Sequence, residues 1–295
     1  MKIIYSDKRF SSKSLRLIEQ ANEIIEEYES AGYDLTLRQL YYQFVSRGLI
    51  PNNQREYKNL GSVVNDGRLA GRISWLAIVD RTRAVRRPST WDSPSSILQV
   101  AADSYAIDRW DRKFQTTRVE VWIEKDALVG VFEPICREWQ VPLFSCRGYT
   151  SQSAMWSAAK RFMNNYENYQ DTLILHFGDH DPSGLDMTQD IIGRMETFGA
   201  RVEVMRLALN MDQVREYGPP PNPAKLTDSR IGGYLANYGE ESWELDALEP
   251  KVLSRLVVDG IKSVLSKDAW SAALAREEQG RDEIIKAITN IGARE

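Results

Sequence analysis

Two apolar stretches decide the fold, and each runs into acidic residues. The sequence reads VEVWIEKD over residues 119–126 and TLILHFGDHDPSG over residues 172–184. Both stretches start with the β-branched and apolar residues that favour buried strands. In an open parallel sheet, ligands bind beyond the carboxyl ends of the strands. We therefore predict a functional site where these two strands end.

Three carboxylates gather at the strand ends. Asp179 and Asp181 are alternate residues of an extended segment, so they point the same way while His180 points to the other side. Glu124 can join them from the neighbouring strand. Three hard oxygen donors with no Cys or His beside them suit Mg²⁺ or Mn²⁺ better than Zn²⁺. The alternative is that Asp-His-Asp-Pro is a solvated turn that caps the next helix.

The residues around these stretches alternate between strand and helix patterns. We expect strands at 119–124, 141–146, 172–178 and 202–208, and helices at 126–139, 151–168 and 183–198. This alternation predicts an α/β fold in which helices cover both faces of a Rossmann-like parallel sheet. Arg147 follows the second strand, at the same edge of the sheet as Glu124. There it either holds a phosphate or is a surface charge.

The N-terminal part of the chain is predicted to be helical. One amphipathic helix covers residues 12–30, and a second starts at Thr36 with Gln39 in the capping-box position. A third helix follows Asn53. Helix, short turn and helix form the frame of a helix-turn-helix, which is the core of a winged-helix domain.

At 295 residues the chain is long enough for two domains. Residues 86–96 break all periodicity, so we expect a loop or wing there and then a connecting helix over 97–116. We place the N-terminal domain at residues 1–115 and the α/β domain at residues 116–295. The α/β domain ends in helical additions after Ser242.

The second helix carries an unusual pair of side chains. At 100° per residue, its packing face includes Leu40, Tyr41 and Phe44. Tyr42 points away from this face, and Arg38 lies four residues earlier on the same, exposed side. A fixed cation beside a phenol favours the phenolate and could also hold a phosphate. The alternative is an ordinary surface tyrosine.

Charge is distributed unevenly along the chain. The formal net charge is −4 and the sequence pI is about 5.5, so the protein as a whole does not attract nucleic acid. Residues 36–87, however, hold ten Lys or Arg against three acids, a local excess of +7. Such a patch on a helix-turn-helix frame predicts binding to double-stranded DNA. The candidate contacts are Arg68, Arg72, Arg81 and Arg83, with Arg147 at the sheet edge.

Cysteine usage and hydropathy favour the cytoplasm. Cys136 and Cys146 form neither a disulfide framework nor a zinc spacing. The sequence shows no signal-peptide pattern and no segment near the roughly 20 apolar residues of a membrane span. We expect a protein of the reducing cytosol with no membrane contact.

The motifs resemble those of one known family. Residues 121–127, 147–149 and 179–184 are together similar to the Toprim domain of the A subunit of DNA topoisomerase VI and of the meiotic double-strand-break protein. Residues 36–42, TLRQLYY, resemble the winged-helix motif of that family. These are two independent motifs in the expected order.

The resemblance extends over about residues 36–260 and includes WELDAL at residues 243–248. Within the family the chain looks most like the reduced mini-A proteins of phage and bacterial genomes, which implies a nucleoid-associated or mobile-element setting. The chain departs from the family in being shorter than a full A subunit. In addition, Arg147 stands where the family usually has Lys, and Thr150 replaces a Pro.

The resemblance implies the DNA-cleaving activity of a type IIB topoisomerase A subunit. Tyr42 would attack a backbone phosphorus, and Arg38 and Glu124 would be the other catalytic residues. Mg²⁺ or Mn²⁺ held by Glu124, Asp179 and Asp181 would neutralise the phosphate. The resemblance also implies a homodimer in which tyrosine and metal come from different subunits, and a separate B-type ATPase subunit.

Two other functions stay open. A Toprim nuclease would cut DNA with a metal-activated water and leave Tyr42 idle. A DNA-binding dimer would have lost cleavage altogether. Retention of Tyr42 together with all three carboxylates argues against the second alternative.

Overall fold

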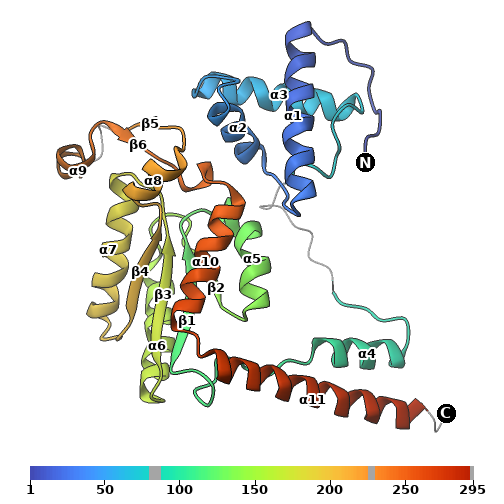
Figure 1. The fold of residues 1–295 in the computed structure, drawn as a ribbon, viewed down its shortest axis with the longest axis vertical. Coiled ribbons are helices and arrows are strands. Elements are labelled where there is room, and N and C mark those ends of the chain that lie inside the picture. The colour runs from blue at the N-terminus through green and yellow to red at the C-terminus, as the bar shows by residue number, and fades with distance from the viewer. Residues whose placement is uncertain (80–87, 225–229, 293–295) are drawn as a thin grey trace.

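The N-terminal lobe is built from three helices that stand beside the rest of the molecule (Figure 1). The computed structural model describes residues 1–79, 88–224 and 230–292. The helices of the lobe are α1 (Ser12–Ser30), α2 (Leu37–Ser46) and α3 (Gln54–Leu69). Side chains of Ser11, Thr36 and Asn53 cap them. All three predicted helices are confirmed, whereas the winged-helix assignment stays a prediction.

The segment between the lobe and the sheet differs from the prediction. The expected wing falls partly on residues 80–87, which lie outside the described residues. Ser93 already caps helix α4 (Pro94–Ser104), and the predicted helix over 97–116 is wrong beyond its first turns. Asp108 accepts a hydrogen bond from the backbone N–H of Trp110. Such local side-chain bonds compete with helix formation, and they turn the chain toward the sheet.

A parallel sheet forms the centre of the second part of the molecule. Its strands are β1 (Thr117–Ile123), β2 (Leu143–Ser145), β3 (Asp171–Phe177) and β4 (Glu203–Ala208). They lie in the order β2-β1-β3-β4, and all neighbouring pairs are parallel. The predicted four-stranded parallel sheet is therefore confirmed. In the register of β1 and β3, Ile123 lies beside Phe177, so both strands end at the same edge.

Helices cover both faces of the sheet, as the strand–helix alternation predicts. Val121 and Leu175 belong to a buried cluster with residues of α5 (Val129–Glu138) and α10 (Pro250–Val264). Their neighbours Trp122 and Ile174 pack on the opposite face, against helices α6 (Gln152–Glu167) and α7 (Pro182–Thr197). Because most positions of the central strands β1 and β3 are buried on one face or the other, these two strands read as nearly continuous apolar runs.

The C-terminal part of the chain returns to the N-terminal lobe. Its elements are α8 (Met211–Tyr217), β5 (Asn222–Pro223), α9 (Ile231–Tyr238), β6 (Glu241–Ser242), the short helix η2 (Leu245–Ala247), α10 and α11 (Lys267–Gly292). Ala247 of η2 is buried in the same hydrophobic cluster as α1, α2 and α3. Helix α11 instead packs against α4 (Figure 1). Within the described part of the chain, no helix is both long and apolar enough to cross a membrane.

A close approach at the start of α7 shapes the loop after β3. A Cβ built on Gly184 would lie 2.2 Å from the carbonyl oxygen of Asp179, whereas one on Gly193 of the same helix would meet nothing within 4 Å. We expect Gly184→Ala to lower the free energy of unfolding by about 1–3 kcal/mol, because a rigid backbone must shift. Gly193→Ala is the matched control and should be neutral or stabilising by up to about 1 kcal/mol. Urea unfolding of both variants measures this, and equal effects would contradict it.

Candidate active site

Glu124 and Asp179 meet where β1 and β3 end. The Glu124 Oε2 atom accepts a hydrogen bond of 2.8 Å from the backbone N–H of Asp179, and the Glu124 N–H donates to the carbonyl oxygen of Phe177 at 2.8 Å. The structure thus brings together two of the three predicted carboxylates. His180 faces the other way, with Nδ1 lying 2.9 Å from the Tyr234 hydroxyl, as the alternation of side chains predicts.

Asp181 has a different immediate partner. Its Oδ1 atom accepts a hydrogen bond of 2.6 Å from the backbone N–H of Gly184 and so caps helix α7. This is the capping role that the sequence left open as an alternative. As the side chains stand, the described residues contain no group of three His, Cys, Asp or Glu placed to hold a metal ion.

The chemistry of the donor set nevertheless fits a hard divalent cation. Burial raises the pKa of Glu124, and it raises the pKa of Asp179 to about 7 against the opposing pull of the Lys125 ammonium. Buried carboxylates that lie close together are stabilised by a bound cation. Glu124, Asp179 and Asp181 would hold Mg²⁺ or Mn²⁺ once Asp181 turned from the helix toward the other two.

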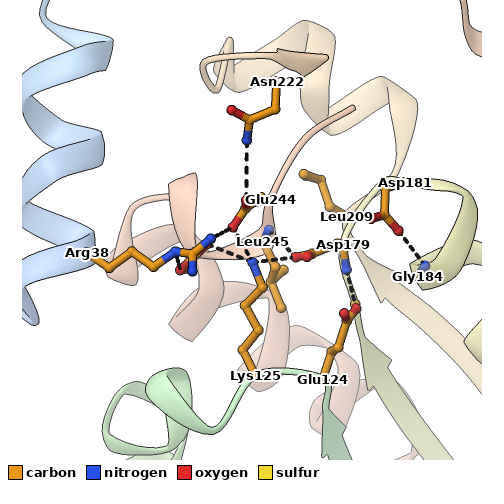
Figure 2. Close-up of polar contacts among 12 residues, drawn as sticks. Arg38, Glu124, Lys125, Asp179, Asp181, Gly184, Leu209, Asn222, Glu244 and Leu245 are labelled. Carbon is orange, nitrogen blue, oxygen red and sulfur yellow. Dashed lines mark hydrogen bonds and ion pairs between the residues drawn. The ribbon is translucent and has the colours of Figure 1, made fainter. Parts of the chain in front are cut away.

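Lys125 occupies the centre of a second set of three carboxylates, which shares Asp179 with the first (Figure 2). Its Nζ atom lies 3.0 Å from Asp179 Oδ1, 2.7 Å from Glu244 Oε2 and 3.0 Å from Asp246 Oδ1. Burial alone would lower the pKa of Lys125, but the three carboxylates outweigh it and raise the pKa. The backbone N–H of Leu245 also donates to Asp179 Oδ1 at 2.8 Å, so η2 is fastened directly to the carboxylate edge of the sheet.

Arg38 of α2 joins this network, and the environment of Tyr42 beside it differs from the prediction. The guanidinium pairs with Glu244 and lies 3.0 Å from Asp246 Oδ2. Tyr42 beside it is only 4% exposed, so the prediction of an exposed phenol is wrong. A helical wheel identifies the face that packs on the helix's own lobe. The second face of α2 is covered by η2 from the far end of the chain, which no local pattern reveals.

The electrostatics of Tyr42 also differ from the expectation. Burial, followed by the negative charges of Asp246 and Glu244, raises the pKa of Tyr42 to about 12. The Arg38 guanidinium lies 5.8 Å from the centre of the phenol ring and lowers this pKa only in part. Arg38 thus favours the phenolate, as predicted, but burial and the two carboxylates outweigh its effect on the pKa of Tyr42. The neighbouring Tyr41 hydroxyl donates to Asn52 Oδ1 at 2.9 Å and serves the lobe itself.

Arg206 of β4 supports the backbone of the loop after β3, which carries Asp179. Its guanidinium donates to four backbone carbonyls and one hydroxyl, namely those of Gly178, Asp179, Gly184, Leu209 and Thr188. Burial lowers the pKa of Arg206 to about 10, and Glu124 opposes this shift. One buried cation thus fixes the backbone on both sides of Asp179 and offsets the charge of the carboxylates in front of it.

Four residues of this site were not predicted to be functional, and each had a signal in the sequence. Lys125 directly follows Glu124, so it shares the strand end. Glu244 and Asp246 are alternate acids within the apolar WELDAL stretch, where buried charges need partners. Arg206 is a cation inside the predicted strand 202–208. Burying its charge there also costs free energy unless hydrogen-bond acceptors surround it.

The predicted DNA contacts Arg68, in the last turn of α3, and Arg72, just after that helix, have different environments. Arg68 donates to the carbonyl oxygens of Trp75, at 3.0 Å, and Ile78, and its guanidinium lies over the Trp75 ring. Burial lowers its pKa, so Arg68 holds its own lobe together. Arg72 is exposed and lies over the ring of Phe10, which leaves its charge available at the surface.

The other predicted contacts lie elsewhere. Arg147 is exposed at the sheet edge, and its Nε atom lies 3.1 Å from Asp126 Oδ1. Arg81 and Arg83 fall within residues 80–87, outside the described residues. Of the three predicted DNA contacts that the structure describes, Arg72 and Arg147 are therefore the two at the surface.

Comparisons with known proteins add no relative. No model of a known protein family matches the sequence, and a search of curated proteins finds no match. The resemblance to the topoisomerase VI A subunit therefore rests on the motifs themselves. The polar network around Lys125 is what ties these motifs together in space.

A buried histidine behind the site gives the protein an acid sensitivity. His176 Nδ1 lies 2.9 Å from the Thr188 hydroxyl, and burial, followed by the charge of Arg206, lowers the pKa of His176 to about 3. The stabilisation from the neutral ring is complete above the unfolded-state pKa of about 6.5 and is lost as the pH falls through the folded-state value.

We therefore expect the free energy of unfolding to drop with falling pH by up to about 1.4 kcal/mol per pH unit below about pH 6.5 from this group. His176→Gln removes the titrating group and should flatten this part of the dependence. Urea unfolding at several pH values between 5 and 8 compares the two proteins. Parallel curves for wild type and variant would rule the histidine out as the cause.

Proposed function

We propose that the chain is a DNA-cleaving protein of the type IIB topoisomerase A-subunit kind. The observation that carries the proposal is that Arg38 of α2 lies in one polar network with the carboxylate edge of the sheet (Figure 2), and that Tyr42 is in polar contact with Glu244 of this network. Arg38 reaches Glu244, Glu244 reaches Lys125, and Lys125 reaches Asp179. The two motifs of the resemblance, which are far apart in the sequence, are thereby neighbours.

In the proposed reaction the Tyr42 Oη atom attacks a backbone phosphorus. The new bond joins Oη to phosphorus, and the bond from phosphorus to the departing deoxyribose oxygen breaks. The phenol proton leaves to solvent, and the departing oxygen takes one up. Arg38 would donate to a non-bridging oxygen and stabilise the extra charge. Glu124, Asp179 and Asp181 would hold a divalent cation, which would supply neutralisation of the phosphate charge.

The finer features of the proposal follow the resemblance. The three N-terminal helices support a winged-helix domain over residues 1–115, and the sheet supports a Toprim domain over residues 116–295. The basic residues of 36–87 would bind double-stranded DNA. A homodimer, a separate B-type ATPase subunit and a cytoplasmic, nucleoid-associated or mobile-element setting complete the proposal.

The burial of Tyr42 favours one alternative function. A phenol whose pKa is about 12 is a weak nucleophile. A Toprim nuclease that uses metal-activated water would not need it. The two functions differ in whether DNA becomes attached to the protein, so a single assay separates them.

The first test is covalent capture of DNA. We expect denaturing electrophoresis of labelled duplex incubated with protein and Mg²⁺ or Mn²⁺ to show a protein–DNA adduct. Tyr42→Phe should abolish it because only the attacking hydroxyl is lost. Tyr41→Phe is the matched control and should retain it. EDTA and Asp179→Ala should each reduce the adduct by at least a hundredfold.

Other outcomes of this assay decide between the functions. Cutting without an adduct, at the same rate in wild type and Tyr42→Phe, would make the water-using nuclease the better proposal. An adduct that persists in Tyr42→Phe would move the nucleophile to another residue. No cutting and no adduct, with DNA binding intact, would leave a cleavage-inactive DNA-binding protein.

A second test asks whether one chain supplies the whole site. The resemblance implies a tyrosine and a metal from different subunits, whereas here Tyr42 is linked to Asp179 of its own chain through Glu244 and Lys125. We therefore expect no recovery of cleavage when Tyr42→Phe and Asp179→Ala proteins are mixed. Nicking of one strand by exchanged subunits would instead place the site between chains. Subunit exchange is verified with differently tagged proteins.

A further inference from the structure

The Glu244 carboxylate occupies an unusual position beside the candidate nucleophile. Its Oε2 atom lies 2.7 Å from Lys125 Nζ and also pairs with Arg38, and the Tyr42 hydroxyl is in polar contact with it. Burial alone would raise the pKa of Glu244, but Lys125 and then Arg38 lower it to about 2. The group is therefore an anion at every physiological pH.

The three groups around Glu244 are those that recognise phosphate. An ammonium and a guanidinium are the usual cationic donors to non-bridging phosphate oxygens, and a phenol is the group that would attack the phosphorus. We propose that Arg38, Lys125 and Tyr42 form a phosphodiester-binding site and that Glu244 occupies it as a built-in substitute for DNA. This inference rests on the proposed function, because it names the place of the cleaved phosphate.

The space beside Glu244 is large enough for a nucleotide. A cavity of about 540 Å³ lies between the N-terminal lobe and the residues Asn222, Pro223 and Glu244, within the range of small-molecule sites. Its lining includes Arg38, Tyr42 and Glu244, together with the aromatic rings of Tyr41 and Tyr57. Glu244 is partly exposed to this cavity, whereas Lys125 lies deeper. Rotation of the Glu244 side chain would therefore open the two cations to a ligand in the cavity.

Asp246 keeps the site assembled when Glu244 leaves. Its two oxygens lie 3.0 Å from Lys125 Nζ and 3.0 Å from Arg38 Nε, and its side chain is almost fully buried. Besides the two cations and the Tyr42 hydroxyl, Glu244 has a long contact of 3.4 Å from Asn222 Nδ2. The two carboxylates thus have different roles. Asp246 maintains the position of both cations, and Glu244 fills the anion position between them.

A role as general base for Tyr42 fits the same contacts less well. A base works best when its pKa is near the working pH, and the two cations keep the carboxylate of Glu244 far below that range. Moreover, a phosphate bound to Arg38 and Lys125 would repel the carboxylate. The two roles predict opposite effects of removing the charge, because loss of a base stops cleavage and loss of a substitute ligand improves DNA binding.

The test compares Glu244→Gln with Glu241→Gln. Both changes remove one negative charge, but Glu241 is exposed on β6 and outside the network. Binding of a fluorescein-labelled oligonucleotide is measured by anisotropy in EDTA, so that no cleavage occurs. We expect Glu244→Gln to tighten binding at least tenfold and Glu241→Gln to change it less than twofold. Adding Lys125→Met to Glu244→Gln should cancel the gain.

A second probe separates the phosphate from the rest of the DNA. Inorganic phosphate should compete with the oligonucleotide at lower concentration for Glu244→Gln than for Glu241→Gln. Equal effects of the two variants in both assays would overturn the inference, because the change would then reflect net charge alone. A gain specific to Glu244→Gln without any covalent adduct would support the anion site and reject cleavage. An adduct in wild type with no such gain would support cleavage and reject the anion site.

Discussion

Two cations that contact the same two carboxylates determine how the N-terminal lobe is positioned against the parallel sheet. Arg38 comes from α2 and Lys125 from the end of β1, and Glu244 and Asp246 lie between them. Each carboxylate contacts both cations, so neither cation can leave without exposing a buried charge. The segment that carries the carboxylates is in turn fixed to Asp179 by the N–H of Leu245. The N-terminal lobe is thereby positioned on the carboxylate edge of the sheet by charge as well as by apolar contact.

This arrangement explains the state of Tyr42. Because η2 covers the second face of α2, the phenol is removed from water and surrounded by more negative than positive charge. Both effects favour the protonated phenol, and they hold the candidate nucleophile in its least reactive form. A DNA phosphate that replaced Glu244 would leave the two cations in place and carry the same single negative charge as the carboxylate. The exchange would therefore admit the substrate without changing the net charge around the phenol.

The sequence allows some parts of this site to be predicted and not others, for physical reasons. Glu124 and Asp179 could be paired because parallel strands of similar length end at one edge, and each follows a continuous apolar run. Asp181 could not be assigned, since an extended segment before a helix presents the same carboxylate either to a ligand or to the helix N-terminus. The burial of Tyr42 could not be predicted, because its cover lies about two hundred residues further along the chain. A helical wheel describes only one contact surface of a helix that has two.

A partly buried ion network of this kind adds little to stability, since the loss of hydration offsets most of the attraction between the charges. Apolar side chains of similar volume at Arg38, Lys125, Glu244 and Asp246 would hold the two lobes together equally well. Such an apolar interface would also stay closed, because no solute in water would take the place of one of its side chains. In a charged interface, one anion can replace another at little net cost in free energy when the incoming anion makes the same contacts. The choice of charged residues at this interface is thus understandable if it has to open to a phosphate, and the uneven burial of Glu244 and Asp246 indicates which of the two would leave.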